Sequence, residues 1–207
     1  MTTALGSIDV RAGEGRRATV TRSTRETDVT VTVDLDGTGD ADVSTGVGFY
    51  DHLLGSFAHH GLLDLTIRAR GDLQVDDHHT VEDVALVLGA AIAEALGARA
   101  GIERFGDATV PMDEAVATAV LDVGGRPYTV VDLPFRGERA GELTLQLIEH
   151  ALEAFARTAG ATLHVRGTGR NDHHLAEAAF KALGRALRAA AAPDPRRRGV
   201  ASTKGST

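Results

Sequence analysis

The sequence contains no cysteine among its 207 residues, which excludes disulfides, iron–sulfur clusters, cysteine nucleophiles and thiolate zinc sites. It also lacks an apolar run long enough to span a membrane, because the longest apolar-rich stretch covers only Val84 to Leu96 and includes Glu94. The first residues lack the basic, apolar and small-residue regions of a signal peptide. We therefore expect a cytoplasmic protein with no membrane partner.

Basic charge is scarce as well. The chain has 22 Lys and Arg residues against 29 Asp and Glu residues, which gives a formal net charge of −7. This balance argues against a nucleic-acid partner, and an anionic ligand would need a local group of basic side chains. Apolar residues make up 43% of the chain, which is ordinary for a globular protein with a substantial core.

Histidine, in contrast, is abundant. Of the nine histidines, His150 and His164 stand apart and the others fall in three tight groups. These groups are His52 with His59 and His60, His78 with His79, and His173 with His174. Because imidazole binds metal ions and exchanges protons near neutral pH, the composition indicates metal or acid–base chemistry.

Hydrophobic periodicity predicts strands and amphipathic helices over most of the chain. Strands are expected over residues 19–25, 28–35, 41–44, 63–69, 114–122, 127–133 and 162–166. Helices are expected over residues 49–60, 78–96, 142–158 and 173–192. Residues 1–15 show no periodicity, and we expect them to form a flexible leader.

The two halves of the chain repeat each other. An offset of 88 residues places Glu26 on Glu114, an offset of 98 places His52 on His150, and an offset of 95 places the pair His78 and His79 on His173 and His174. The offset changes between elements, where insertions are tolerated. We therefore predict an α+β fold with an internal duplication. Residues 16–100 and 101–193 would form two similar halves, each a roughly four-stranded sheet packed with two helices.

The motif HHxxE occurs once in each half, in DDHHTVED (76–83) and NDHHLAEA (171–178), each at a helix start that a preceding Asp could cap. Residues four apart share a helix face, so His78 with Glu82 can chelate one ion and His173 with Glu177 another. Successive helical residues point about 100° apart, which directs His79 and His174 elsewhere. We expect each ion to take the odd histidine from the other repeat.

The equivalent residues His52 and His150 would add one ligand each to these two sites. A single HH pair at a helix start is usually solvated, but the duplication of the whole set favours a metal centre. Ligands of histidine and carboxylate without sulfur suit Mn, Fe, Co or Zn.

A phosphate pocket is expected from the few well-placed basic residues. Forked guanidinium groups, an ammonium and small-residue backbone amides bind phosphate. The candidates are Arg104, Arg126, Lys181 and the C-terminal run Ser202, Thr203, Lys204 and Gly205. Lys181 lies one helical turn beyond Glu177, and residues 194–207 would form a tail that contributes to the substrate phosphate site.

Several segments in order resemble the imidazoleglycerol-phosphate dehydratase family. They are GVGFYDHLLGSFAHHG, DDHHTVEDVALVLGAAI, RFGDATVPMDE, GRPY, IEH, NDHHLAEAAFKALGRALR and STKG. The resemblance covers the chain from about Arg22 to Gly205 and implies the monofunctional form. The implied reaction is removal of water from D-erythro-imidazoleglycerol phosphate, giving imidazoleacetol phosphate in L-histidine biosynthesis.

The resemblance also implies the ligands and partners. Two Mn²⁺ ions per active site would be held by His52, His78, Glu82 and His174, and by His79, His150, His173 and Glu177. Substrate contacts would come from Glu26, His52, His60, His78, His79, Glu82, Arg104, Arg126, His173, His174, Lys181, Ser202, Thr203 and Lys204. The family forms a shell of 24 subunits with active sites between subunits.

Glu26 is the candidate acid–base residue, since the resemblance places it at the substrate and outside the ligand sets. Glu82 and Glu177 are also expected in the catalytic centre, but their lone pairs would be occupied as ligands. The proton to be removed is not beside a carbonyl, so the imidazole ring of the substrate is the only electron reservoir. Two rival hypotheses are a dinuclear metal-dependent phosphate-ester hydrolase and a non-catalytic metal-storage protein.

Overall fold

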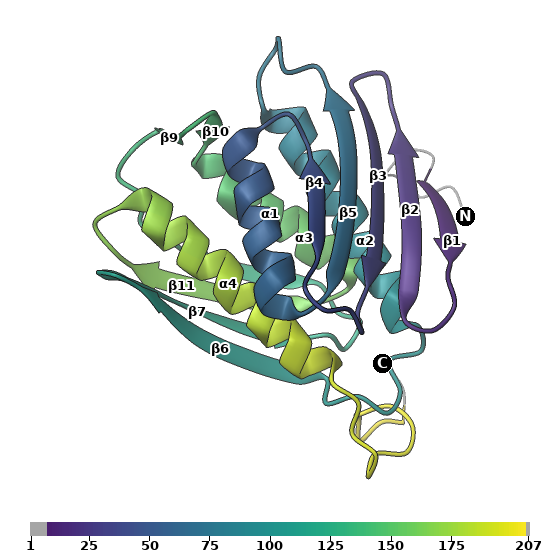
Figure 1. Cartoon of the computed structure of the whole chain (residues 1–207). Coiled ribbons are helices and arrows are strands. Elements are labelled where there is room, and N and C mark those ends of the chain that lie inside the picture. The colour runs from purple at the N-terminus through teal and green to yellow at the C-terminus, as the bar shows by residue number, and fades with distance from the viewer. Residues whose placement is uncertain (1–7, 206–207) are drawn as a thin grey trace.

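Two β-sheets enclose four helices in the computed structural model, which describes residues 8–205 (Figure 1). The first sheet has five strands in the order β1-β2-β3-β5-β4. They are β1 (Ile8–Ala12), β2 (Arg17–Ser23), β3 (Thr27–Asp34), β4 (Ala41–Ser44) and β5 (Asp64–Gly71). Helices α1 (Gly48–Gly61) and α2 (His78–Leu96) cover one face of this sheet.

The second sheet has four strands in the order β6-β7-β11-β8. They are β6 (Phe105–Met112), β7 (Ala115–Asp122), β8 (Tyr128–Asp132) and β11 (Thr162–Thr168). Helices α3 (Gln146–Ala159) and α4 (Asp172–Ala191) cover its inner face. Two short strands, β9 (Arg139–Ala140) and β10 (Leu143–Thr144), form a separate hairpin between β8 and α3.

The register of the two sheets confirms the predicted duplication. In the first half Thr30 lies opposite Arg68, and in the second half their equivalents Thr118 and Arg166 lie opposite each other. In both halves the third strand of the repeat joins the sheet in parallel with the strand that follows the first helix. The chain therefore has the α+β fold of two similar halves, and equivalent residue pairs lie opposite each other in both sheets.

The halves meet through their helices, because α1 packs against α4 and α2 packs against α3. Every second residue of the strands points inward and completes the core. Val29, Val31 and Val33 of β3, for example, are fully buried. Helix α2 lies between a sheet and α3, so its apolar residues are buried on two sides. Both HHxxE motifs thus begin helices that belong to the interface between the halves.

Three elements differ from the sequence-based expectations. Strand β1 lies within the expected flexible leader, where it pairs with β2, while residues 1–7 fall outside the described part of the chain. Strand β6 was not predicted, because small residues such as Gly106 and Ala108 fill its inward positions and weaken the alternation. The helix expected over 142–158 begins only at Gln146, since Leu143 and Thr144 form β10.

None of the helices in the described range 8–205 is both long enough and apolar enough to cross a membrane.

Two equivalent glycines set the helix contacts between the halves. A Cβ on Gly184 would overlap the carbonyl oxygen of Phe57, and a Cβ on Gly89 would overlap that of Phe155. Backbone cannot yield as a flexible side chain does, so Gly184→Ala and Gly89→Ala should each lower the free energy of unfolding by about 1–3 kcal/mol. Denaturant unfolding followed by circular dichroism measures this loss.

Gly55 provides the matched control, since it also lies inside a helix but has open space at its Cβ position. Gly55→Ala should raise the free energy of unfolding by about 0.5–1 kcal/mol, through helix propensity alone. Equal responses of Gly55→Ala and Gly184→Ala would refute close packing at the second site.

Candidate metal centres and anion pocket

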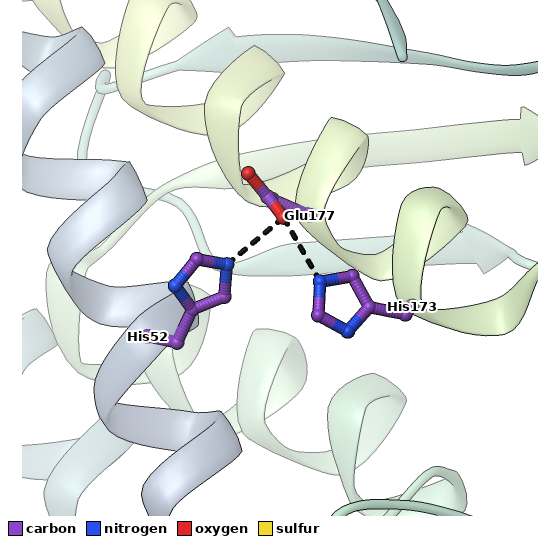
Figure 2. Close-up of side chains that lie close together, drawn as sticks. All are labelled: His52, His173 and Glu177. Atoms are coloured by element: carbon purple, nitrogen blue, oxygen red, sulfur yellow. Dashed lines mark hydrogen bonds and ion pairs between the residues drawn. The ribbon is translucent and has the colours of Figure 1, made fainter. Parts of the chain in front are cut away.

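The first cluster of possible ligands joins α1 to α4 (Figure 2). His52 of α1 places Nε2 2.9 Å from Oε2 of Glu177, and His173 places Nε2 3.2 Å from the same oxygen. One ligand atom of each residue lies within 4.8 Å of the others. Glu177 is buried while both imidazoles are exposed, so the cluster opens to the surface with its carboxylate at the base.

The second cluster joins α2 to α3 in the equivalent way. His78 and Glu82 come from α2, and His150 from α3 places Nε2 3.5 Å from Oε1 of Glu82. This Nε2 is buried and forms no hydrogen bond within residues 8–205. A buried nitrogen without a hydrogen bond is costly, and coordination to a cation would satisfy its lone pair. The donor set therefore fits a metal ion.

The two lone histidines are grouped differently from the expectation. The resemblance implied His52 with His78 and Glu82, but within one chain His52 lies with the motif of the second half. His150 correspondingly lies with the motif of the first half. The physical reason is the pairing of α1 with α4 and of α2 with α3, which brings each lone histidine to the other half. Within one chain, each lone histidine therefore lies beside the motif of the other half, and the ligand sets that the resemblance implies for sites between subunits stay a prediction.

The second histidine of each motif points away from its cluster, as the helix geometry predicted. Nδ1 of His79 lies 3.1 Å from Asp72 and 3.9 Å from Glu26. Nδ1 of His174 lies 2.9 Å from Glu114, which is the equivalent of Glu26 under the repeat. The hydrogen bond that His79 donates to Asp72 raises the pKa of His79, and the one that His174 donates to Glu114 raises the pKa of His174.

Lys181 belongs to the first cluster. Its Nζ lies 2.7 Å from Oε1 of Glu177. Burial alone would raise the pKa of Glu177, but hydrogen bonds from His52 and Lys181 lower it to about 2. His60 is also affected by Lys181, because burial together with the positive charge of Lys181 lowers the pKa of His60. Glu177 is thus held as a carboxylate, the form that binds cations.

A basic pocket lies at the end of the second sheet where β6 begins and β7 ends, and Lys181 does not line it. A cavity of about 520 Å³ is lined by Arg104, Phe105, Gly124, Arg126, Ala201, Ser202, Thr203 and Lys204. It therefore brings both arginines together with Ser202, Thr203 and Lys204 of the C-terminal run. Lys181 is not among the lining residues, because it shares a helix face with Glu177 instead.

Asp122 is a functional candidate that the sequence reasoning did not assign. It holds the Arg104 guanidinium through two hydrogen bonds, of 2.7 Å from Nε and 2.9 Å from one terminal nitrogen. The other terminal nitrogen of Arg104 donates to the carbonyl of Ala201 at 2.7 Å. Arg104 thereby connects the sheet to the tail. The equivalence of Asp122 with Asp34 marked the position but not its partner.

The fold and site define a duplicated α+β protein with two histidine–carboxylate clusters and a basic pocket. The chain belongs to the imidazoleglycerol-phosphate dehydratase family, whose model matches residues 45–187. It is 56% identical over 191 residues to the imidazoleglycerol-phosphate dehydratase of Methanoculleus marisnigri, which covers 92% of this chain and 99% of that protein. The enzyme of Methanocella arvoryzae is 55% identical over 190 residues, covering 92% and 98%.

Solved structures of the family agree. The imidazoleglycerol-phosphate dehydratase of Pyrococcus furiosus superposes with a TM-score of 0.78 at 34% identity, covering 90% of this chain and 99% of that one. The enzyme of Staphylococcus aureus gives a TM-score of 0.76 at 34% identity, covering 84% and 98%.

The contact from Arg104 to Ala201 should depend on Asp122. In Asp122→Ala the guanidinium loses both hydrogen bonds that orient it, and such charged bonds are worth about 1.5–3 kcal/mol. The amides of residues 199–205 should then exchange hydrogen roughly tenfold to a hundredfold faster, as measured by mass spectrometry.

Asp34→Ala is the control, because Asp34 is equivalent to Asp122 under the repeat and its carboxylate accepts, among residues 8–205, only a local bond from the Asp36 amide. Exchange in residues 199–205 should be unchanged in this variant. An Asp122→Ala protein whose tail exchanges at the unmodified rate would show that Arg104 needs no orientation by Asp122.

Proposed function

We infer that the chain is a hydro-lyase that removes water from D-erythro-imidazoleglycerol phosphate and gives imidazoleacetol phosphate, a step in L-histidine biosynthesis. The observation that carries this conclusion is the combination of family membership along most of the chain with two clusters of imidazole and carboxylate ligands. A phosphorylated imidazole offers ring nitrogens to such clusters and a phosphate to a basic pocket. The chemical groups of the substrate therefore match the groups that the chain offers.

We propose Mn²⁺ as the metal, with two ions per active site. His52, His173 and Glu177 would hold one ion, and a second set, His78, Glu82 and His150, would hold the other. Three ligands per cluster leave room for further ligands on a six-coordinate ion. His79 and His174 point away from these clusters, which supports the proposal that they serve sites shared between subunits of a cytoplasmic assembly of 24.

When bound, the metal ions stabilise negative charge on the imidazole ring of the substrate. The residues of the chain would bind the other end and move the protons. Arg104 and Arg126, with Ser202, Thr203 and Lys204, supply the charge and hydrogen-bond donors for the phosphate. Lys181 neutralises Glu177 and would contact the substrate from the side of the cluster.

Glu26 is the proposed acid–base residue. Its carboxylate is half exposed and lies 3.9 Å from Nδ1 of His79, so it is free to reach a substrate. It would take the carbon proton next to the departing hydroxyl. Glu177 is less suited to this step, because His52, His173 and Lys181 already occupy its oxygens. Glu82 is similarly engaged as a member of the second cluster.

The rival hypothesis of a phosphate-ester hydrolase is not favoured. The similar proteins are named as dehydratases, and this chain matches them along nearly their whole length. A non-catalytic metal store would have no use for the basic pocket around Arg104 and Arg126.

Incubation of the Mn²⁺-loaded protein with imidazoleglycerol phosphate should release the ketone product and no inorganic phosphate. Ketone is measured by its absorbance in alkali and phosphate by a colorimetric assay. Addition of a chelator should stop the reaction, and added Mn²⁺ should restore it. Release of phosphate without ketone would establish the hydrolase instead.

The grouping of ligands seen within one chain predicts an outcome that the grouping implied by the resemblance does not. His52→Ala combined with His173→Ala removes two ligands from one cluster and none from the other. This double variant should keep about one Mn²⁺ per chain, as measured by isothermal titration and elemental analysis. Under the grouping that the resemblance implied, both sites would each lose a ligand, and tight binding of both ions should fail.

A further inference from the structure

The second half of the chain contains an insertion that the first half lacks. Three residues, 45–47, connect β4 to α1, whereas thirteen residues, 133–145, connect β8 to α3. The difference of ten accounts for the change of the repeat offset from 88 to 98. Residues 133–145, here called the inserted segment, include the β9–β10 hairpin, which turns at Gly141 with a φ of +57°.

The inserted segment is bonded to the start of α2 through Asp77. This carboxylate is 7% exposed. Its two oxygens accept the Thr144 amide at 2.6 Å and the Thr144 hydroxyl at 2.9 Å, and Arg139 lies 3.5 Å away. Asp77 does not cap its own helix. Asp76 does so instead, accepting the His78 amide at 2.9 Å, which corrects the expected role of the Asp beside the histidine pair.

The same segment is bonded to the start of α4 through the equivalent residue, Asp172. Its carboxylate accepts the amide of Arg136 at 3.0 Å and that of Gly137 at 2.7 Å. The cap of α4 is again the preceding residue, since the side chain of Asn171 accepts the His173 amide at 3.0 Å. In both motifs, therefore, the first polar residue caps the helix and the second holds the inserted segment.

These bonds join the helices that carry the metal ligands. Thr144 lies two residues before α3, which carries His150, and Asp77 directly precedes His78, so their bonds fix the two helices of the second cluster. On the other side Gly141 approaches Phe49 of α1. The Phe49 ring lies 4.6 Å from the ring of His173, measured between centroids. The segment thus contacts the first turns of all four ligand-bearing helices.

We propose that Asp77 and Asp172 are positioning residues, which use the inserted segment to set the distance between metal ligands from the two halves. The proposal rests on the metal binding inferred above. Asp77 governs the cluster of His78, Glu82 and His150, while Asp172 governs the cluster around Glu177. Neither aspartate belongs to a cluster itself.

Titration of the full-length protein with Mn²⁺ tests the two assignments. Loss of a residue that orients metal ligands typically costs 10–100-fold in metal affinity. Asp77→Ala should weaken one of the two ions by about this factor, and Asp172→Ala should weaken the other. When Asp77→Ala is added to the double variant His52→Ala and His173→Ala, the single remaining ion should be weakened to the same extent.

Asp64→Ala is the matched control for a general loss of stability. Asp64 also accepts backbone amides from a loop, those of Thr38, Gly39 and Asp40, but it lies at the start of β5. It should lower the denaturation midpoint and leave both Mn²⁺ affinities within about twofold. Asp77→Asn, which keeps an oxygen for the Thr144 amide, should recover most of the lost affinity.

A metal-free measurement separates this proposal from the inferred metal binding. In the apo protein, Asp77→Ala should speed hydrogen exchange in residues 144–150, and Asp64→Ala should not. Unchanged exchange together with two unchanged Mn²⁺ affinities would overturn the proposal, as would equal weakening of both ions by Asp77→Ala and Asp64→Ala. Faster exchange in a protein whose unmodified form binds no Mn²⁺ would instead contradict the metal binding itself.

Discussion

The packing of α1 on α4 and of α2 on α3 is the constraint on which both histidine–carboxylate clusters depend. Each cluster takes its lone histidine from one half and its histidine–glutamate pair from the other. Neither half could therefore assemble a cluster alone. Gly89 and Gly184 allow these helices to approach closely, so the residues that permit the core contact also determine where the ligands meet.

The sequence was sufficient to predict the duplication, most strands, all four helices and the six residues that meet in the two clusters. Repeat offsets report equivalence between halves, however, and carry no information on which helices pack together. The offsets therefore could not show that His52 lies beside His173 and Glu177 within one chain. Lys181 was placed on the correct helix face beside Glu177, yet that same placement keeps it out of the pocket around Arg104. Strand β6 was missed because its first two inward residues, Gly106 and Ala108, are small and weaken the alternation.

Departures from the repeat mark where the two halves have different tasks. Asp122 holds Arg104, whereas its equivalent Asp34 accepts the local amide of Asp36. The hydrogen bond from His174 is the main cause that lowers the pKa of Glu114 to about 2. The equivalent residue Glu26 lies 3.9 Å from His79 and is more exposed than Glu114. The same position thus carries a close ion pair in one half and a more exposed carboxylate in the other.

Ligands from opposite halves of one chain should share each ion, and anomalous diffraction from crystals grown with Mn²⁺ tests this directly. We expect two anomalous peaks per chain. One should lie within bonding distance of His52, His173 and Glu177, and the other within bonding distance of His78, Glu82 and His150. A peak bonded to both His52 and His78 of the same chain would contradict the account.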